Sequence, residues 1–230
     1  MMGELKSLDV IIESKLNNYF SQQEALNEVK RIFPELAFFP PTRGWSGSPD
    51  FLLKLVELVV SESPKYVVEF GSGVSSIVLG AAMQKFSNGK VDSFDHEEVY
   101  CNKTSRFLEV NGLQNIVNIS HSRLVSYSFD GENWDWYDKL QIDKIEGEID
   151  LLVVDGPPRF LQDKSRFLAL PILFDRLSEK STVVLDDANR ENEKQVIEDW
   201  KDFLKTKDAE YSITTFEYFE KGLFMIEIKK

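Results

Sequence analysis

The stretch Val67-Val68-Glu69-Phe70-Gly71-Ser72-Gly73-Val74-Ser75-Ser76 decides the fold of this chain. Its apolar residues predict a buried strand, and the glycines and serines that follow predict a tight turn into a helix. Gly71 and Gly73 allow the backbone to approach a ligand where a Cβ atom would collide. The first turn of the helix points free N–H groups toward the same place. The pattern favours a bound ligand at the turn, and a turn without a ligand is the alternative.

Glu69 discriminates between classes of ligand. A dinucleotide-binding turn needs a third glycine, at the position where Ser76 stands, and it places a pyrophosphate at the start of the helix. The Glu69 carboxylate would repel a pyrophosphate at this turn, because like charges at close range disfavour binding. A ligand that carries a positive charge fits the turn better.

The pattern E-x-G-x-G of Glu69, Gly71 and Gly73 resembles the first motif of class I S-adenosylmethionine-dependent methyltransferases. In that family the acidic residue lies near the ammonium group of the cofactor, and the glycines pass beneath its ribose. Further motifs follow in an order that resembles methyltransferase family 24. They are Gly44-Trp45-Ser46, Ser93 to Glu97 (SFDHE), Trp136 to Asp138 (WYD), Val153 to Pro158 (VVDGPP), Ser165 to Leu170 (SRFLAL) and Val184 to Arg190 (VLDDANR).

The composition limits the kinds of partner. The chain has 230 residues, enough for one α/β domain, and a formal net charge of −12. This charge opposes binding to a phosphate backbone, so we expect a small-molecule substrate and no nucleic-acid partner. The N-terminus has no signal-peptide pattern, and Lys54 and Glu57 interrupt the longest apolar run, at residues 51–60. We therefore expect a cytoplasmic protein without a membrane partner.

Strands and helices alternate from residue 65 onward. Apolar runs predict strands at 66–69, 91–95, 116–120, 149–155 and 182–186, with amphipathic stretches between them. This alternation predicts a doubly wound, mostly parallel α/β sheet, the Rossmann-like arrangement. Residues 211–219 and 223–228 predict a C-terminal antiparallel hairpin, which brings the sheet to seven strands. The methyltransferases that the motifs resemble end in the same way.

Two segments lie outside this alternation. Apolar positions predict a helix over residues 5–20, and the capping-box pattern of Ser21 and Glu24 predicts a second helix to residue 33. We divide the chain into N-terminal helices with a gating loop (1–48) and an S-adenosylmethionine-binding domain (49–230), together one compact domain. Residues 125–137 predict an aromatic hairpin, which packs on the body, binds substrate or contacts a second subunit. The hairpin and the N-terminal helices are the two candidate surfaces for a homodimer.

Polar residues at the ends of the predicted strands form one candidate site, because ligands of open α/β sheets bind there. Asp95 follows the glycine turn by about twenty residues, where a carboxylate can accept both ribose hydroxyls. The resemblance places His96 along adenine and His121 with Ser122 beside it, and the alternative is that they are ordinary strand-end residues. The predicted cofactor-binding residues are Glu69, Gly71, Ser72, Gly73, Ser75, Asp95, His96, His121, Ser122 and Asp155.

Three carboxylates, Asp155, Asp186 and Asp187, end two neighbouring predicted strands. Close like charges need a cation or a shared proton, so we expect a divalent metal, Mg²⁺ or Mn²⁺, to bind all three. The set resembles that of the catechol-type metal-dependent O-methyltransferases, although Asp187 stands where those enzymes have an amide. The alternative is that Asp186 holds the loop or caps the next helix. One cysteine and two histidines leave no Cys/His zinc site.

Basic residues follow the rigid Gly156-Pro157-Pro158 loop and face this acidic edge of the sheet. Arg166 either holds a carboxylate or phosphate of the substrate or pairs with the aspartates. Lys164 is a candidate general base. The predicted catalytic residues are Asp155, Arg166 and Lys164.

The resemblance implies an enzyme that transfers a methyl group from S-adenosylmethionine to a small molecule, at oxygen, with or without a metal. Proximity and orientation would supply most of the catalysis. Two alternatives stay open at this point. One is a non-catalytic S-adenosylmethionine-binding interaction module, since binding motifs and turnover are separable. The other is an NAD-dependent oxidoreductase, against which Glu69 and the C-terminal hairpin both argue.

Overall fold

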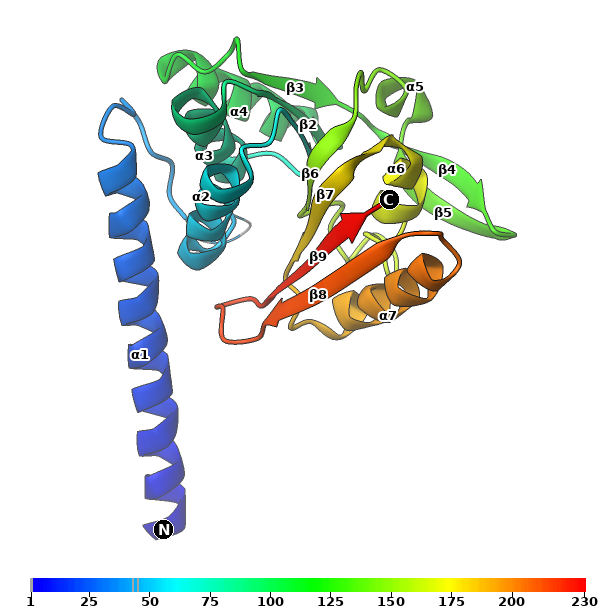
Figure 1. Cartoon of the computed structure of the whole chain (residues 1–230). Helices are drawn as coiled ribbons and strands as arrows, with labels where there is room; N and C mark the ends of the chain where they lie inside the picture. Colours follow the sequence, from blue (N-terminus) through cyan, green and yellow to red (C-terminus); the bar gives the residue numbers. More distant parts are fainter. Residues whose placement is uncertain (1, 43, 45) are drawn as a thin grey trace.

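A seven-stranded sheet forms the centre of the molecule (Figure 1). The computed structural model describes residues 2–42, 44 and 46–230, so Trp45 of the motif at residues 44–46 lies outside the described residues. The strand order is β3-β2-β1-β6-β7-β9-β8; β9 runs antiparallel to both of its neighbours, β7 and β8, and the other neighbouring strands pair in parallel. The bounds are β1 (Tyr66–Phe70), β2 (Lys90–Asp95), β3 (Val117–His121), β6 (Ile149–Val154), β7 (Leu177–Asp186), β8 (Glu210–Phe216) and β9 (Leu223–Lys229). The predicted mostly parallel sheet with a C-terminal antiparallel hairpin is confirmed.

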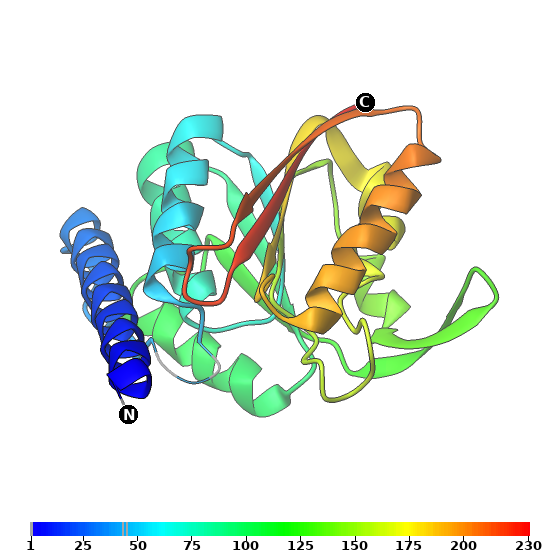
Figure 2. The ribbon, with the colours of Figure 1, turned by 90° about the horizontal axis from the view of Figure 1, so that it is seen from below.

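Helices cover both faces of this sheet (Figure 2). One face carries α2 (Pro49–Glu62), α3 (Val74–Ala82) with its π-helical continuation η1 (Met83–Ser87), and α4 (Glu98–Val110). The other carries α5 (Lys139–Ile142), α6 (Ala169–Leu173) with the 3₁₀ turn η2 (Phe174–Arg176), and α7 (Glu191–Lys205). Successive residues of β6 point into different cores: Leu151 packs with the first set of helices and Leu152 with the second. This two-sided burial explains why the strand is a continuous apolar run.

The predicted aromatic hairpin is present as β4 (Leu124–Phe129) and β5 (Glu132–Tyr137), which pair only with each other among the described strands. Its base packs into the core, because Trp136 and Tyr137 are fully buried. The Tyr137 ring stacks on Phe70 of β1 at 4.9 Å between ring centroids. These contacts agree with the packing interpretation of the hairpin, while its tip extends beyond the body (Figure 1).

The N-terminal region differs from the prediction of two helices, because α1 (Met2–Ile32) is one continuous helix. The capping-box pattern at Ser21 does not end it, since no proline or glycine stands between residues 4 and 33 to stop the helical backbone. Only its C-terminal part packs on the body, where Gln22 Nε2 donates to Asp50 Oδ2 of α2 at 2.7 Å. The rest projects away from the domain (Figures 1 and 2). No described helix, α1 included, is both long and apolar enough to cross a membrane.

Candidate active site

A cavity of about 400 Å³ opens at the carboxyl edge of the sheet. Its wall combines the turn after β1, the ends of β2 and β6, one face of α4 and the loop that precedes α2. The volume lies within the range of small-molecule sites, which is roughly 300–1,000 Å³. The residues that line it are Pro40, Pro41, Ser46, Gly47, Gly71, Ser72, Gly73, Val74, Ser75, Asp95, His96, Glu97, Tyr100, Lys103, Thr104, Phe107, Asp155, Gly156, Pro158 and Phe160.

The glycine turn forms the floor of this cavity. Gly71 has φ of +98° and Gly73 has φ of +155°, conformations that residues with a Cβ rarely adopt. Gly71 also lies against the end of β6, because a Cβ added to it would come within 3.3 Å of the Asp155 carbonyl carbon. The two strand ends are therefore packed backbone to backbone, and the turn leaves the N-terminus of α3 open toward the cavity.

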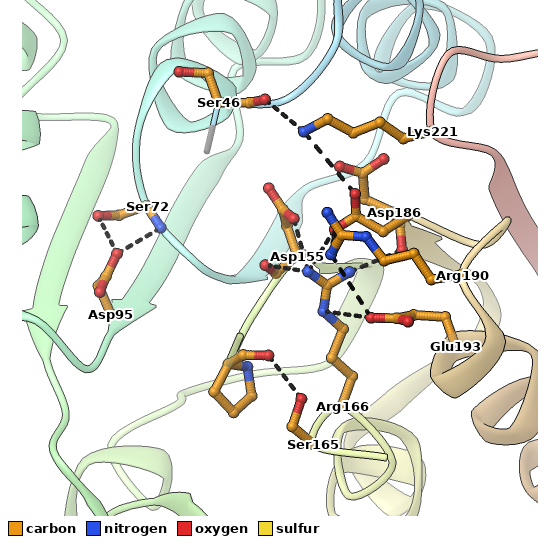
Figure 3. Close-up of polar contacts among 12 residues, drawn as sticks. Ser46, Ser72, Asp95, Asp155, Ser165, Arg166, Asp186, Arg190, Glu193 and Lys221 are labelled. Atoms are coloured by element: carbon orange, nitrogen blue, oxygen red, sulfur yellow. Dashed lines mark hydrogen bonds and ion pairs between the residues drawn. The ribbon is translucent and has the colours of Figure 1, made fainter. Parts of the chain in front are cut away.

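Asp95 is fixed beside this turn (Figure 3). Its Oδ2 accepts a hydrogen bond from the Ser72 amide at 2.9 Å and another from the Ser72 hydroxyl at 2.8 Å, and its Oδ1 accepts one from the Glu97 amide at 2.9 Å. The carboxylate lines the cavity while its orientation is set by its own neighbours. It can accept hydrogen bonds from a pair of hydroxyl groups of a bound ligand.

Glu69 lies behind the turn instead of in the cavity wall. Its side chain is fully buried, and its Oε2 accepts a hydrogen bond from the Ser76 hydroxyl at 2.5 Å. Burial raises the pKa of Glu69 to about 7, although hydrogen bonds from Ser75, Ser76 and Ser93 oppose this rise. The structure therefore assigns Glu69 to support of the turn and does not bring it to the cavity, where direct contact with a ligand was predicted.

The residues predicted beside adenine divide into two groups. His96 lines the cavity, with its Nδ1 at 3.5 Å from Asp95 Oδ1. His121 is exposed, and its Nε2 lies 3.2 Å from the main-chain oxygen of His96. Ser122 is buried and its amide donates to the Asp95 carbonyl oxygen at 2.8 Å. Neither His121 nor Ser122 is among the described residues that line the cavity.

Asp155, Asp186 and Asp187 come together as predicted, with one oxygen from each within 4.8 Å of the others. The Arg166 guanidinium lies among them (Figure 3). Its Nη2 donates to the Asp155 carbonyl oxygen at 2.9 Å, to Asp155 Oδ1 at 3.2 Å and to Asp187 Oδ2 at 2.8 Å. Its Nη1 donates to the Asp186 carbonyl oxygen at 2.8 Å. Of the two roles considered for Arg166, the structure contains the pairing with the aspartates.

Further charged residues surround this cluster and were not predicted. Arg190 Nη1 lies 2.6 Å from Asp187 Oδ2, and Lys221 Nζ lies 4.0 Å from Asp187 Oδ1. The buried Glu193 of α7 lies beneath, with Oε1 at 3.9 Å from Arg166 Nε. Arg190 ends the VLDDANR motif, and Glu193 follows it by three residues. Residues at this spacing lie on the same side of a helix, so the sequence contained a signal that the two residues lie together near the cluster. Lys221 lies in the turn between β8 and β9, and its place in the sequence gave no such signal.

Burial dominates the electrostatics of the cluster. It raises the pKa of Asp186 well above its ordinary value, and the charges of Asp155 and Asp187 raise it further. Neither Asp186 carboxyl oxygen has a hydrogen-bond partner among the described residues, which agrees with a neutral acid. The pKa of Arg166 is raised, because four carboxyl groups outweigh its own burial. Arg166 is therefore permanently charged.

The donor set does not fit a divalent cation at the centre of the three aspartates. Two of the three carboxylates already bind the guanidinium of Arg166, and Asp187 also binds Arg190. Only Asp155 lines the cavity, whereas Asp186 and Asp187 are almost fully buried behind it.

Lys164 is the predicted catalytic residue that the structure places elsewhere. Its Nζ donates to Asp199 Oδ2 of α7 at 2.8 Å and lies over the rings of Trp134 and Phe167. It does not line the cavity. A salt bridge on the outer side of α7 accounts for its position, so a role as general base has no geometric support.

One wall of the cavity was missed. Tyr100, Lys103, Thr104 and Phe107 of α4 line it. Their spacing of three and four residues places them on one face of a helix. Because α4 follows β2 and Asp95 closely in the chain, the sequence could have predicted that this face of α4 lines the cavity.

In a comparison with protein families, a family described as a methyltransferase domain matches residues 68–188. This range runs from β1 to the loop after β7 and contains the glycine turn, Asp95 and the aspartate cluster. A comparison with curated proteins finds no match.

Solved structures of methyltransferases share the fold. An O-methyltransferase from Bacillus cereus in complex with S-adenosylhomocysteine aligns with a TM-score of 0.60 at 15% identity, over 90% of this chain and 91% of that one. A methyltransferase from Podospora anserina bound to S-adenosylhomocysteine aligns with a TM-score of 0.61 at 13% identity, over 99% and 97%. An O-methyltransferase from Streptomyces achromogenes in complex with S-adenosylmethionine gives 0.58 at 15%, over 90% of each chain. At these identities the likeness concerns the fold alone.

Proposed function

The chain belongs to methyltransferase family 24, and from this membership we propose that it transfers a methyl group from S-adenosylmethionine to an oxygen atom of a small molecule. The observation that carries the proposal is the cavity in which the glycine turn and Asp95 meet. The O-methyltransferases from Bacillus cereus and Streptomyces achromogenes, bound to S-adenosylhomocysteine and S-adenosylmethionine, support the choice of cofactor and acceptor atom.

The cavity fits the cofactor through residues of this chain. Asp95 would accept the ribose hydroxyls, since its carboxylate lines the cavity and is held there by Ser72. Gly71 and Gly73 would lie beneath the sugar, where any Cβ would reduce the space. His96 would pack beside the base. Ser75 lines the same wall, at the N-terminus of α3.

When bound, S-adenosylmethionine supplies an electrophilic methyl group. The residues of this chain would hold the acceptor in line with it, and orientation of this kind accounts for much of the rate. Asp155 is the only member of its cluster at the cavity, so we assign to it the hydrogen bond that orients the acceptor hydroxyl. Pro158 and Phe160, on the loop that follows, would exclude water from the acceptor.

The first experiment measures ligand selectivity. S-adenosylhomocysteine at about 100 times its Kd should stabilise the protein by about 2.7 kcal/mol, because it binds only the folded state. NAD at the same concentration should leave the thermal midpoint unchanged. Equal stabilisation by NAD would favour an oxidoreductase, and no shift with either ligand would contradict the proposed cofactor.

The second experiment measures turnover. The protein is incubated with methyl-labelled S-adenosylmethionine and a pool of small-molecule metabolites, and labelled products are separated. We expect a labelled product whose methyl group is released under conditions that cleave methyl ethers or esters. Binding of S-adenosylhomocysteine without any labelled product would favour a non-catalytic interaction module.

We also propose that the chain forms a homodimer through α1. Val10, Ile11, Ile12, Leu16, Tyr19 and Phe20 are between 47% and 65% exposed on this helix, although they are apolar. Exposed apolar side chains that gather on one element are typical of an interface. Light scattering of the wild type should give a dimer mass, and Leu16→Glu with Phe20→Glu should give a monomer. Val110→Glu, at an exposed apolar position of α4, is the control.

A further inference from the structure

We propose that Arg166 takes the place of a divalent metal between the three aspartates, so that this enzyme works without a bound metal ion. The inference rests on the proposed methyl transfer. It concerns the cation that organises Asp155, the member of the cluster that faces the acceptor. Three observations carry it: the bonds of the guanidinium, the balance of charge and the position of the cluster behind the cavity wall.

The guanidinium joins the ends of two neighbouring strands. Its Nη2 binds both the carbonyl oxygen and Oδ1 of Asp155, at the end of β6, while its Nη1 binds the carbonyl oxygen of Asp186, the last residue of β7. The Arg166 side chain is 3% exposed, so these bonds form away from solvent. A planar guanidinium donates in several fixed directions at once, as this arrangement requires. Arg166 thereby orients the Asp155 carboxylate, whose other oxygen points away from the guanidinium (Figure 3).

The cations of the cluster balance most of its negative charge. Four carboxyl groups (Asp155, Asp186, Asp187 and Glu193) face three cations (Arg166, Arg190 and Lys221). A divalent ion would bring two further positive charges to within a few ångströms of a guanidinium that has no room to withdraw. At such distances, with little water between the charges, repulsion is strong.

The cluster also lies in the wrong place for metal catalysis. A catalytic metal must bind the protein and the acceptor at the same time. Asp186 is 1% exposed and Asp187 is 2% exposed, and neither lines the cavity. Two of the three ligands that such an ion would need therefore lie outside the cavity.

Manganese binding tests the inference directly. The wild-type protein is treated with EDTA, dialysed and titrated with Mn²⁺, with the free ion followed by its electron paramagnetic resonance signal. We expect no loss of this signal up to millimolar Mn²⁺, with or without S-adenosylhomocysteine, and less than a twofold effect of EDTA on the Kd of S-adenosylhomocysteine. Stoichiometric binding at micromolar Mn²⁺ would overturn the inference. Failure of S-adenosylhomocysteine to bind would instead contradict the proposed function.

Variants of the cluster test the role of Arg166. Arg166→Met should lower the Tm by roughly 10 °C, because it leaves buried carboxylates without their cation. Arg176→Met, at a partly exposed arginine whose Nη1 donates to the Ile145 carbonyl oxygen, is the control and should cost far less. Arg166→Lys keeps the positive charge but loses the fixed N–H donors of the planar guanidinium. Its Tm should therefore lie between those of Arg166→Met and the wild type.

A double variant keeps the test decisive if Arg166→Met folds poorly. Arg166→Met with Asp187→Asn removes one charge of each sign, and it should have a higher Tm than Arg166→Met alone. The same double variant should gain Mn²⁺ binding, because it opens an acid, acid and amide set of oxygen ligands that suits a hard cation. The role of Arg166 would be contradicted if the losses of Tm caused by Arg166→Met and by Asp187→Asn simply add in the double variant. It would also be contradicted if the wild type and the double variant bind Mn²⁺ equally.

Discussion

Ser72, in the turn after β1, and Asp95, the last residue of β2, are joined by two hydrogen bonds to one oxygen, Asp95 Oδ2. The amide of Ser72 donates at 2.9 Å and its hydroxyl at 2.8 Å. The bond from the amide can form only when the glycine turn has its observed backbone shape. The carboxylate at the cavity wall and the turn beneath it are therefore one structural unit.

Asp95→Asn should weaken binding of S-adenosylhomocysteine by roughly 10-fold to 100-fold. The variant loses the negative charge of the carboxylate that would accept hydrogen bonds from the ribose hydroxyls and that accepts them from Ser72. Hydrogen bonds to charged groups contribute about 1.5–3 kcal/mol each. Isothermal titration calorimetry measures the change in Kd. Asp92→Asn, on the same strand but outside the cavity, is the matched control and should leave the Kd unchanged. Equal affinity of Asp95→Asn and the wild type would remove Asp95 from the ligand site.

Gly71→Ala should destabilise the protein more than Gly112→Ala. Both glycines have positive φ, +98° and +69°, so each alanine adds backbone strain of about 1–2 kcal/mol. Only at Gly71 does the new Cβ also press on backbone, at 3.3 Å from the Asp155 carbonyl carbon, whereas nothing lies within 4 Å at Gly112. Thermal unfolding measures both variants. An equal loss of Tm in Gly71→Ala and Gly112→Ala would show that the ends of β1 and β6 can move apart to make room for the new Cβ.

Much of the fold follows from the sequence because the central strands β1 and β6 are buried on both faces. The run Leu151 to Val154 contains no polar residue, and its alternate members fill the two cores. The N-terminal region could not be predicted in the same way. The pattern at Ser21 signals a helix start only where the backbone before it is not helical, and no proline or glycine interrupts the preceding residues from Glu4 onward.

The site was predictable where it depends on strand ends and not where it depends on long side chains. Asp95 and the three clustered aspartates end strands, so the topology of the sheet brings them to one edge. The direction of an arginine or lysine side chain follows from tertiary contacts instead. Arg166 turns into the cluster and Lys164, two residues earlier, turns toward Asp199. The need for a cation was therefore foreseeable, but its identity was not.

Lys164→Met should leave the Kd of S-adenosylhomocysteine and the rate of methyl transfer within about twofold of the wild type. Its ammonium group pairs with Asp199 and lies outside the cavity, and partly exposed salt bridges contribute about 0–1 kcal/mol. Asp155→Asn, at the cavity wall, should lower the rate at least 10-fold in the same assay. A large loss of rate in Lys164→Met with unchanged stability would restore Lys164 as a base.

Glu69→Gln should make the stability of the protein less dependent on pH. Burial raises the pKa of Glu69 in the folded state to about 7, from an ordinary value of 4.5. Between these two pH values the unfolded chain releases the proton first, so ionisation lowers stability as the pH rises. Below pH 4.5 both states are protonated and the cost is zero. Above pH 7 both states are ionised, and the cost is constant at about 3 kcal/mol, since one pKa unit corresponds to about 1.4 kcal/mol.

Urea unfolding of the wild type and Glu69→Gln at several pH values measures this effect. The free energy of unfolding of the variant, relative to that of the wild type, should rise between pH 4.5 and 7 and then level off, because glutamine is similar in size and does not ionise. Glu109→Gln, at an exposed position of α4, is the control and should track the wild type. A difference between Glu69→Gln and the wild type that stays constant across this range would mean that Glu69 is already ionised at pH 5. Its hydrogen bonds from the surrounding serines would then outweigh its burial.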